Sequence, residues 1–329
     1  MTDNILEIRD LVVEYRTGNS VIHAVNNVNL NVKRGETVGL VGETGAGKTT
    51  IARAVMRILQ VPPAKFCGGE IIFQGEDIMT KSDHDMRKIR GDKIAMIFQD
   101  PMTALNPIEK VGYQIAEAIG LHSKITRDDA VRKACDMLEM VGIPMERYDE
   151  YPHQFSGGMK QRVVIAMALA CNPELLLADE PTTALDVTIQ AQVLEMMQKL
   201  KEQMGTSVLM ITHDLGVVAD CCQSVAVIYA GEIVEYGTVE HIFEETSHPY
   251  TLGLFNSLPK LDSTEERLNP IRGLMPDPTN LPQGCKFNDR CPDATEKCAA
   301  AAPDAKEVSP GHFVKCYYAE GGATSGNNA

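Results

Sequence analysis

The chain has 329 residues, of which 44% are hydrophobic, so it is long enough for two domains and too apolar to be an intrinsically disordered chain. Its 45 Asp and Glu residues outnumber its 31 Lys and Arg residues, and the net charge of −14 argues against a broad contact with the phosphate backbone of nucleic acid.

The first hundred residues are predicted to form mainly strands. The first two show partial alternation of apolar and polar residues, which predicts an antiparallel pair with one face towards water. The third leads through a glycine-rich turn into a helix that begins near Ile51. The five predicted strands span residues 5–15, 21–32, 38–41, 68–75 and 93–99.

The middle of the chain changes first to helices and then to buried strands. Residues 101–162 are predicted to form an inserted helical subdomain. The runs at 175–180 and 207–213 are almost wholly apolar and end in polar residues, as in parallel strands that are buried on both faces and carry functional groups at their carboxyl ends. With a helix at 188–204 and a hairpin at 225–236, this alternation predicts an α/β fold around a mostly parallel sheet.

The composition of the chain changes after residue 245. A short helix is expected over 248–258, and residues 259–284 are rich in proline, glycine and turns. We therefore predict one domain over 1–245 and a smaller, loop-rich, cysteine-containing domain over 246–320. The small polar residues 321–329 are expected to be disordered.

The segment from Gly42 to Thr50 has the composition and the context of a phosphate-binding loop, because it lies between a predicted strand and a predicted helix. Its glycines let backbone N–H groups turn towards an anion, and the helix directs its positive end to the same place. Lys48 adds a charge for the β- and γ-phosphates, and Thr49 adds a hydroxyl for Mg²⁺. Because all of these match within one short segment, we favour this function over a turn that is glycine-rich by chance. The candidate binding residues are Gly42, Glu43, Thr44, Gly45, Ala46, Gly47, Lys48, Thr49 and Thr50.

Two acidic residues end the buried run at 175–180. Asp179 is expected to hold Mg²⁺ together with Thr49, and Glu180 to orient and deprotonate an attacking water. Taken alone, acidic residues at a strand end are more often helix caps or solvated turns. The phosphate-binding loop reverses that preference.

Further segments give the chain a resemblance to ABC ATPases. Residues 155–162, Phe-Ser-Gly-Gly-Met-Lys-Gln-Arg, resemble the family's signature motif. Gln99 resembles the Q-loop glutamine, 184–186 the D-loop, His213 the switch histidine and Tyr15 the aromatic residue that stacks on adenine. The resemblance implies a mixed central sheet, an antiparallel β subdomain and an inserted α-helical subdomain. It also implies catalytic roles for Glu180, His213 and Gln99, a Mg²⁺ shell of Thr49, Gln99 and Asp179, and a nucleotide-site role for Asp186.

The signature segment has the features of a second anion-binding helix start. Ser156 is expected to cap the helix, and Gly157 and Gly158 allow close backbone approach. The family architecture implies that ATP lies between the phosphate-binding loop of one subunit and residues Ser156 to Met159 of another. Met159 replaces the glutamine that many members have, a position that contributes mainly backbone and packing.

The C-terminal region narrows the resemblance. His248-Pro249-Tyr250-Thr251, the proline-rich stretch after it and residues 99–107 resemble ATP-binding subunits of dipeptide and oligopeptide importers in the peptide/nickel family. The implied function is ATP hydrolysis that powers peptide import; import of nickel or another small solute is the alternative. A non-transport ABC ATPase acting on ribosomes or DNA is disfavoured, because such proteins usually carry two ATP modules or a long coiled-coil insertion.

The same resemblance implies the partners and the location. The partners are two membrane permease subunits, a second ATP-binding subunit, for which the subfamily favours a different chain, and indirectly an extracytoplasmic peptide-binding protein; no nucleic acid is expected. Residues 1–5 lack the features of a signal peptide, and the longest apolar run, of nine residues, is far shorter than the roughly 20 that span a bilayer. We therefore expect a peripheral protein at the cytoplasmic face of the inner membrane.

Four cysteines lie close together in the C-terminal region. Cys285, Cys291, Cys298 and Cys316 lack the paired spacing of a zinc ribbon. Four thiolates can hold a 4Fe–4S cluster, and the peptide-importer resemblance implies one. Structural zinc and reduced, unrelated cysteines remain alternatives. A structural role fits best, since a loop-rich segment has little core of its own, and a redox-sensing role is compatible with transport.

Overall fold

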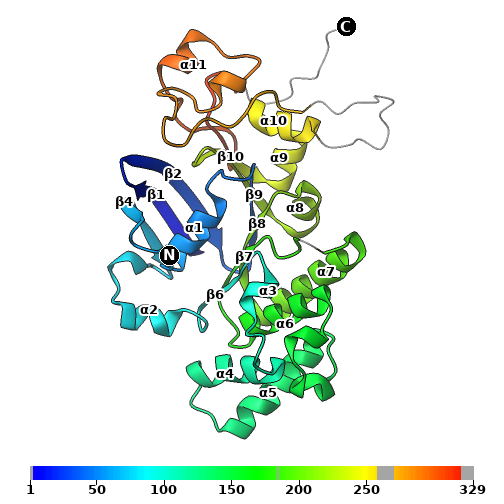
Figure 1. The fold of residues 1–329 in the computed structure, drawn as a ribbon. Coiled ribbons are helices and arrows are strands. Elements are labelled where there is room, and N and C mark those ends of the chain that lie inside the picture. The colour runs from blue at the N-terminus through cyan, green and yellow to red at the C-terminus, as the bar shows by residue number, and fades with distance from the viewer. Residues whose placement is uncertain (1–2, 184, 258–269, 320–329) are drawn as a thin grey trace.

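The structure is a computed structural model that describes residues 3–183, 185–257 and 270–319 (Figure 1). Four sequence-based expectations fall partly or wholly outside these residues. They are the end of the predicted helix at Leu258, the first part of the turn-rich stretch 259–284, Ala184 of the segment that resembles the D-loop, and the C-terminal tail.

A mixed sheet forms the centre of the described chain, with the strand order β11-β12-β10-β9-β3-β8-β7-β6. The run from β9 to β6 is parallel, and the other three strands extend it with antiparallel pairs. The sequence-predicted strands at 175–180 and 207–213 are confirmed as adjacent parallel strands whose residues are buried throughout. The strand bounds are β3 (Thr37–Val41), β6 (Ile94–Ile97), β7 (Leu175–Asp179), β8 (Ser207–Thr212), β9 (Ser224–Tyr229), β10 (Glu232–Thr238), β11 (Lys306–Ser309) and β12 (His312–Val314).

Alternate residues of the parallel strands belong to two different hydrophobic clusters. Leu175 and Leu177 of β7 pack on one face of the sheet, and Leu176 and Ala178 on the other. This follows from the period of two along a strand, and it explains why these strands are apolar at every position. The central sheet is therefore covered on both faces.

A second, antiparallel sheet covers one face. Its order is β2-β1-β4-β5, and the strands span β1 (Asn4–Thr17), β2 (Ser20–Lys33), β4 (Ala64–Phe73) and β5 (Glu76–Asp77). The predicted pairing of the first two strands is confirmed. The strand predicted from residue 68 begins earlier, at Ala64, because it continues to pair with β1 as far as Tyr15. Between the two sheets lies α1 (Lys48–Val55), seen beside β1 and β2 in Figure 1.

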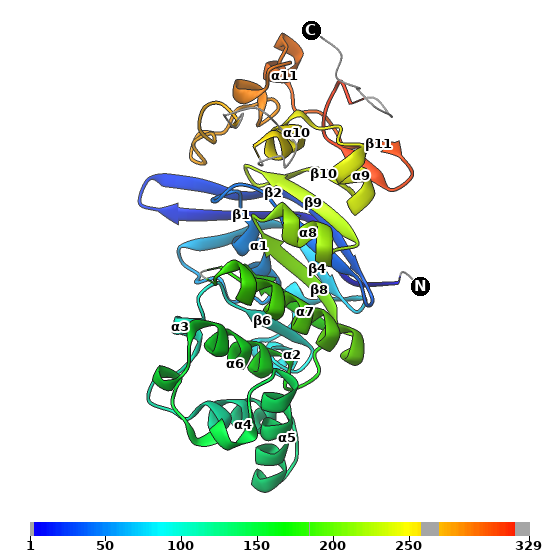
Figure 2. The same ribbon diagram turned by 90° about the vertical axis from the view of Figure 1, so that its right-hand side faces the viewer.

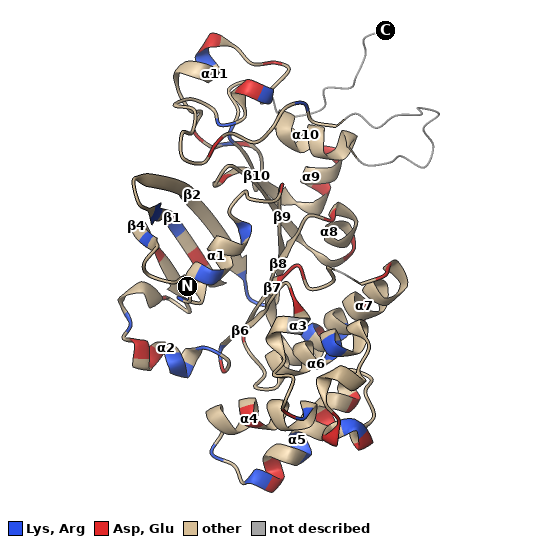
Figure 3. Ribbon diagram, in the orientation of Figure 1, with Lys and Arg blue, Asp and Glu red and all other residues tan. Residues whose placement is uncertain are grey.

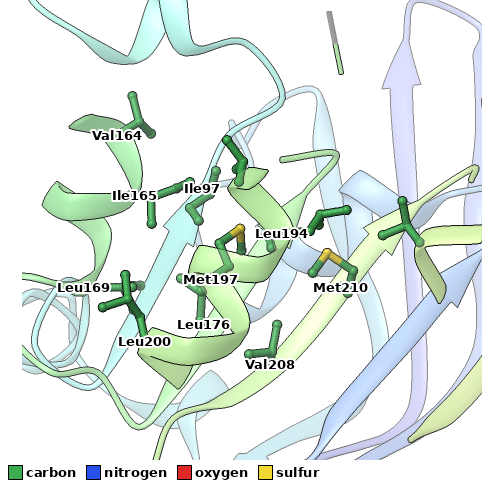
Figure 4. Packing of buried hydrophobic residues seen from close by; sticks show 14 of the residues in the cluster. Ile97, Val164, Ile165, Leu169, Leu176, Leu194, Met197, Leu200, Val208 and Met210 are labelled. Carbon is green, nitrogen blue, oxygen red and sulfur yellow. The ribbon is translucent and has the colours of Figure 1, made fainter. Parts of the chain in front are cut away.

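Helices cover the other face and extend beyond it, as Figure 2 shows. The described residues between 101 and 162 contain several helices, and the last of them continues past residue 162 to Leu169, where it packs on the sheet. The inserted subdomain as a unit stays a prediction. Figure 4 shows side chains of α7 facing this part of the sheet and α6, namely Leu194, Met197 and Leu200. The helices on this side are α3 (Pro101–Ala104), α4 (Val111–His122), α5 (Arg127–Met140), α6 (Gly157–Leu169), α7 (Val187–Met204), α8 (Leu215–Cys221) and α9 (Val239–Glu244), with 3₁₀ turns η2 (Met145–Asp149) and η3 (Pro152–Gln154). The 3₁₀ turn η1 (Ile78–Thr80) and α2 (Asp83–Ile89) instead pack in the cluster that contains α1 and the antiparallel sheet.

The C-terminal region is attached to the central sheet by its own hairpin. It contains α10 (Pro249–Asn256), η4 (Asn288–Arg290), α11 (Glu296–Ala300) and the hairpin β11–β12, whose second strand pairs with β10. The fully buried Glu235 of β10 accepts a hydrogen bond from His312 Nε2 at 2.9 Å, and its carboxylate also accepts the backbone N–H groups of Ser247 and His248. Sequence analysis did not predict this hairpin.

The charges of the surface are mixed. Figure 3 shows Lys and Arg beside Asp and Glu on α2 and α5, so the acidic excess does not form a one-sided helical face there. No helix among the described residues is long and apolar enough to span a membrane.

Candidate functional site

The phosphate-binding loop joins β3 to α1 and requires glycine at two close backbone contacts. A Cβ atom at Gly47, where φ is 105°, would lie 2.4 Å from the carbonyl oxygen of Ala24. A Cβ atom at Gly42 would lie 2.2 Å from the carbonyl oxygen of Ile228. No side chain caps the first turn of α1, so its N–H groups face the loop without a competing side-chain acceptor.

Lys48 lies within the loop, and its ammonium group is turned onto the loop's own carbonyl groups. Its Nζ donates to the carbonyl oxygens of Gly42 at 2.7 Å and Glu43 at 3.0 Å. Burial lowers the pKa of Lys48, and three nearby carboxylates oppose that shift. An anion in the loop would give this ammonium a charged partner in place of two neutral carbonyls.

Thr49 and Asp179 are brought together as the sequence predicted. The Thr49 hydroxyl donates to Asp179 Oδ1 at 3.1 Å, and Asp179 is 2% exposed at the end of β7. Burial raises the pKa of Asp179, and the Thr49 hydrogen bond opposes that shift. A hydroxyl and a carboxylate at this distance are oxygen ligands of the kind that Mg²⁺ prefers, so the residues present fit that ion.

Glu180 lies at the centre of a polar cluster one residue further on. Its Oε2 accepts Gln99 Nε2 at 2.8 Å and the Thr183 hydroxyl at 2.9 Å, and its Oε1 lies 3.1 Å from His213 Nδ1. Burial raises the pKa of Glu180, but the hydrogen bonds from Thr183 and His213 outweigh it and hold the pKa below its ordinary value.

The backbone at Glu180 is also unusual. Its φ of 49° is in the left-handed region, which residues with side chains rarely adopt, and its N–H donates to the carbonyl of Ile211 at 2.8 Å. Such strain often occurs at functional sites.

The side-chain contacts of Glu180 also show which predicted residues meet. Gln99, Glu180 and His213 follow the ends of three different strands, and the structure brings them together.

The remaining predicted residues lie at the rim of this site or elsewhere. The hydroxyl of Tyr15 lies 3.2 Å from Thr50 Oγ1, beside the start of α1. Asp186 accepts the N–H of Ile189 at 3.0 Å and so caps α7 within the chain.

The signature segment begins α6 as expected. Ser156 accepts the N–H of Met159 at 3.4 Å. A Cβ atom at Gly158 would lie 2.5 Å from Ile189 Cγ2, whereas one at Gly157 would meet nothing within 4 Å. Both Figures 1 and 2 show α6 in a different part of the molecule from α1. The close approach of Ile189 thus explains glycine at Gly158, whereas the backbone at Gly157 faces open space.

Sequence reasoning missed three residues of the site. Thr183 follows Glu180 by three positions, and a hydroxyl so close in the chain could have been predicted to donate a hydrogen bond to that carboxylate. Arg147 was missed as well, although its guanidinium lies 4.3 Å from the centre of the Phe155 ring and 3.3 Å from the sulfur of Met159. Arg290, 247 positions after its partner Glu43, gave no sequence signal.

The four cysteines line one cavity of about 820 Å³ in the C-terminal region. Burial raises the pKa of the Cys285 thiol, and it raises the pKa of the Cys291 thiol to about 11. Within residues 3–183, 185–257 and 270–319, no group of three or more His, Cys, Asp or Glu residues has an arrangement that could hold a metal ion. The cysteines thus share a cavity without forming a closed ligand set.

Two family models match the chain. The model described as "ABC transporter" matches residues 25–183, and the one described as "Oligopeptide/dipeptide transporter, C-terminal region" matches residues 234–298. The first contains the phosphate-binding loop, the signature segment and Glu180. The second begins in β10 and includes three of the four clustered cysteines.

Curated relatives are similar over almost the whole chain. The oligopeptide transport ATP-binding protein OppD of Bacillus subtilis is 50% identical, over 95% of this chain and 88% of that protein. OppD of Escherichia coli is 45% identical, over 96% of this chain and 93% of that protein. Among solved structures, the ATP-binding cassette MJ0796 bound to ADP and Pi in a dimeric post-hydrolysis state has a TM-score of 0.64 at 29% identity, covering 71% of this chain and 98% of that one.

Proposed function

The chain belongs to the ABC transporter family of ATP-binding proteins, and from this premise we propose that it hydrolyses ATP to power the import of dipeptides or oligopeptides. As in the family generally, its nucleotide is ATP with Mg²⁺. The proposal of ATP hydrolysis is supported above all by the position of Glu180. Its carboxylate accepts hydrogen bonds from Gln99 and Thr183, and it follows Asp179 directly in the chain. Peptide as the cargo is supported by the C-terminal family match and by the relatives.

Each residue of the site has a proposed role in hydrolysis. Lys48 exchanges its two carbonyl partners for the β- and γ-phosphates, and Thr49, Asp179 and Gln99 are the residues that would hold Mg²⁺. The ion, when bound, neutralises charge that develops on the phosphates. Glu180, kept ionised by its hydrogen bonds, accepts a proton from the attacking water. His213, already within 3.1 Å of Glu180, contacts the γ-phosphate and holds the geometry of that water.

The site is completed by a second subunit. The start of α6 offers open backbone at Gly157, and the helix is positive at that end. Because α6 and α1 lie in different parts of the chain, we propose that Ser156 to Met159 contact ATP bound to a partner subunit, with Tyr15 against the adenine and Asp186 beside the shared nucleotide. The dimeric state of the similar cassette MJ0796 supports this arrangement.

The proposed assembly follows from the peptide-importer relatives. The helical part of the chain docks on two permease subunits, and a second ATP-binding subunit completes the motor. A peptide-binding protein outside the membrane supplies the cargo. The protein is then peripheral, at the cytoplasmic face of the inner membrane. Nickel or another small solute is the alternative cargo within the same machinery.

The four clustered cysteines are proposed to hold a 4Fe–4S cluster, with Zn²⁺ as the alternative. Their thiols line one cavity but do not form a closed ligand set there, so the proposal rests on the chemistry of four sulfur donors, which would have to converge to hold either group. Bound there, the group would connect η4, α11 and the end of the hairpin, in addition to a few hydrogen bonds such as that from the Cys285 N–H to the Cys298 carbonyl at 2.8 Å. Its chemistry in this role is that of a structural crosslink.

Transport by the assembled complex tests the function. We would measure uptake of a labelled dipeptide and of nickel in vesicles that contain this chain, its permeases and its partner ATPase, with the peptide-binding protein supplied on the outer side. The expected result is ATP-dependent peptide uptake that is lost in Glu180→Gln and retained in Glu195→Gln. Glu195 is a matched control because it forms an exposed surface pair with Lys199. Nickel uptake without peptide uptake would contradict the proposed cargo.

A further inference from the structure

The cysteine-bearing segment contacts the phosphate-binding loop directly. Arg290, which immediately precedes Cys291, donates through Nη1 to Glu43 Oε2 at 2.8 Å and through Nη2 to Glu43 Oε1 at 2.9 Å. The arginine side chain is only 6% exposed. Two parallel hydrogen bonds between a guanidinium and a carboxylate fix both distance and orientation, so this pair is a specific link between the two regions.

The guanidinium is itself held from the C-terminal side. Its Nε donates to the carbonyl of Arg272 at 3.0 Å, and Nη1 also donates to the hydroxyl of Tyr229 at 3.3 Å. The central carbon of the guanidinium, Cζ, lies 5.7 Å from the centre of the Tyr229 ring and 5.9 Å from the centre of the Phe287 ring. The side chain of Arg290 is thus held by the C-terminal region and the end of β9 as well as by Glu43.

Glu43 is anchored through its backbone as well. Its N–H donates to the hydroxyl of Tyr250 at 3.0 Å, and its carbonyl accepts Lys48 Nζ at 3.0 Å. Tyr250 packs against Tyr229 and Phe287, with ring centres 4.6 and 5.4 Å away. One residue of the loop therefore receives three contacts, two from the C-terminal region and one from the phosphate-binding lysine.

We propose that Arg290 is a positioning residue of the ATP site, which holds Glu43 and thereby keeps the phosphate-binding loop in the conformation that receives ATP. Without Arg290, the half-buried Glu43 carboxylate loses its charged partner and the loop has to be ordered by the nucleotide. Arg290 does not contact Glu180, so its loss weakens ATP binding more than it slows hydrolysis of bound ATP.

The link works in both directions. If the C-terminal segment favours the ATP-receptive loop, bound ATP must stabilise that segment by the same factor. The C-terminal region in this view supports the phosphate-binding loop through Glu43, a contribution that the motifs of the first 245 residues do not supply. The proposal rests on the ATPase activity alone and is independent of the cargo and of what the cysteines hold.

The test uses Arg290→Met, Arg290→Lys, Glu43→Gln and the double variant Arg290→Met with Glu43→Gln. The matched control is Arg34→Met, which breaks an exposed Arg34–Glu174 pair of 3.1 Å away from the loop. We would measure the Kd for ATP of the full-length chain, and KM and kcat for ATP of the assembled transporter. A thermal melt of each variant checks that it is folded.

The expected result is a rise of about tenfold in Kd and KM for Arg290→Met, with kcat changed less than about twofold. Glu43→Gln should act similarly, and the double variant should be no worse than either single one, because both remove the same contact. Arg290→Lys keeps the positive charge but cannot form the two parallel hydrogen bonds to Glu43, so its rise in Kd and KM for ATP should be smaller.

Unchanged Kd and KM in folded Arg290→Met and Arg290→Lys would overturn the proposal. So would effects that multiply in the double variant, or a loss of kcat at constant KM that follows the fraction of unfolded protein. If Arg290→Met does not fold, Arg290→Lys and Glu43→Gln decide the question by the same measurements.

Discussion

The hydroxyl of Thr183 donates a 2.9 Å hydrogen bond to Glu180 Oε2, the same oxygen that accepts the side-chain amide of Gln99. Both donors stabilise the ionised form of the carboxylate. A group that must accept a proton from water is thus kept in its charged state by neighbours on two different loops. This relationship makes the ionisation of Glu180 open to experiment.

Glu180→Gln should keep ATP binding and lower hydrolysis by about 10²- to 10⁴-fold, the usual contribution of a general base. The amide has nearly the same shape but cannot accept the proton from water. Turnover of the assembled transporter and the Kd for ATP of the purified chain check this, with Glu195→Gln as the control. Turnover close to that of the unchanged chain would remove Glu180 from its role.

Thr183→Val should move the acid limb of the kcat–pH profile to higher pH. The Thr183 hydrogen bond lowers the pKa of Glu180, so its removal raises that pKa. Because the active form is the carboxylate, activity is then lost at a higher pH as the solution is acidified. Thr183→Ser keeps the hydroxyl and should leave the limb in place. Identical acid limbs in all three proteins would show that this hydroxyl does not set the ionisation of Glu180.

Gly47→Ala should abolish ATP binding. The new methyl group would lie 2.4 Å from the Ala24 carbonyl, at a φ of 105° that alanine rarely adopts. The loop and the start of α1 would both have to move. Binding is measured by calorimetry, and Gly120→Ala in α4 is the control, since its added Cβ meets nothing within 4 Å. Normal affinity in Gly47→Ala would mean that the loop adapts to the clash.

Protein purified without oxygen should contain about four iron and four sulfide per chain and absorb visible light. Cys298→Ser should lose the iron, because this thiol lines the shared cavity, while Cys67→Ser should keep it, because Cys67 is exposed and lies outside that cavity. Zinc without iron would favour the alternative metal.

The same cysteine variants separate a structural from a sensing role. Reduced thermal stability with an unchanged response of transport to oxidants is expected of a crosslink. Altered transport on oxidation, lost together with the iron, would instead indicate redox regulation.

The parts of the site that the sequence predicted depend on short stretches of chain. Asp179 and Glu180 were found because a wholly apolar run ends at them, and β7 proves to be buried along its length. Lys48 and Thr49 follow from the glycine spacing before α1. Such signals lie within a few neighbouring residues, where the period of a strand or the start of a helix determines the geometry.

The parts that the sequence did not predict depend on contacts between distant segments. The hairpin β11–β12 is short, and it is stabilised by pairing with β10 and by the contact between His312 and Glu235. The contact of Arg290 with Glu43 joins a 3₁₀ turn to a loop. Neither the hairpin nor the Arg290–Glu43 contact leaves a pattern in neighbouring residues, because the segments that meet are far apart in the chain and become neighbours only after the sheet has formed. The predicted domain division at residue 245 stays a prediction.

The pairing of β12 with β10 limits how relatives of this protein can be recombined. A chimera joined near residue 245 would leave Glu235 of one parent facing the hairpin of the other. If that hairpin lacked the counterpart of His312, a fully buried carboxylate would lose a hydrogen-bond partner, at a cost of a few kcal/mol by order of magnitude. Exchange of C-terminal regions should therefore carry β10 along with the hairpin, with the crossover placed before Glu232.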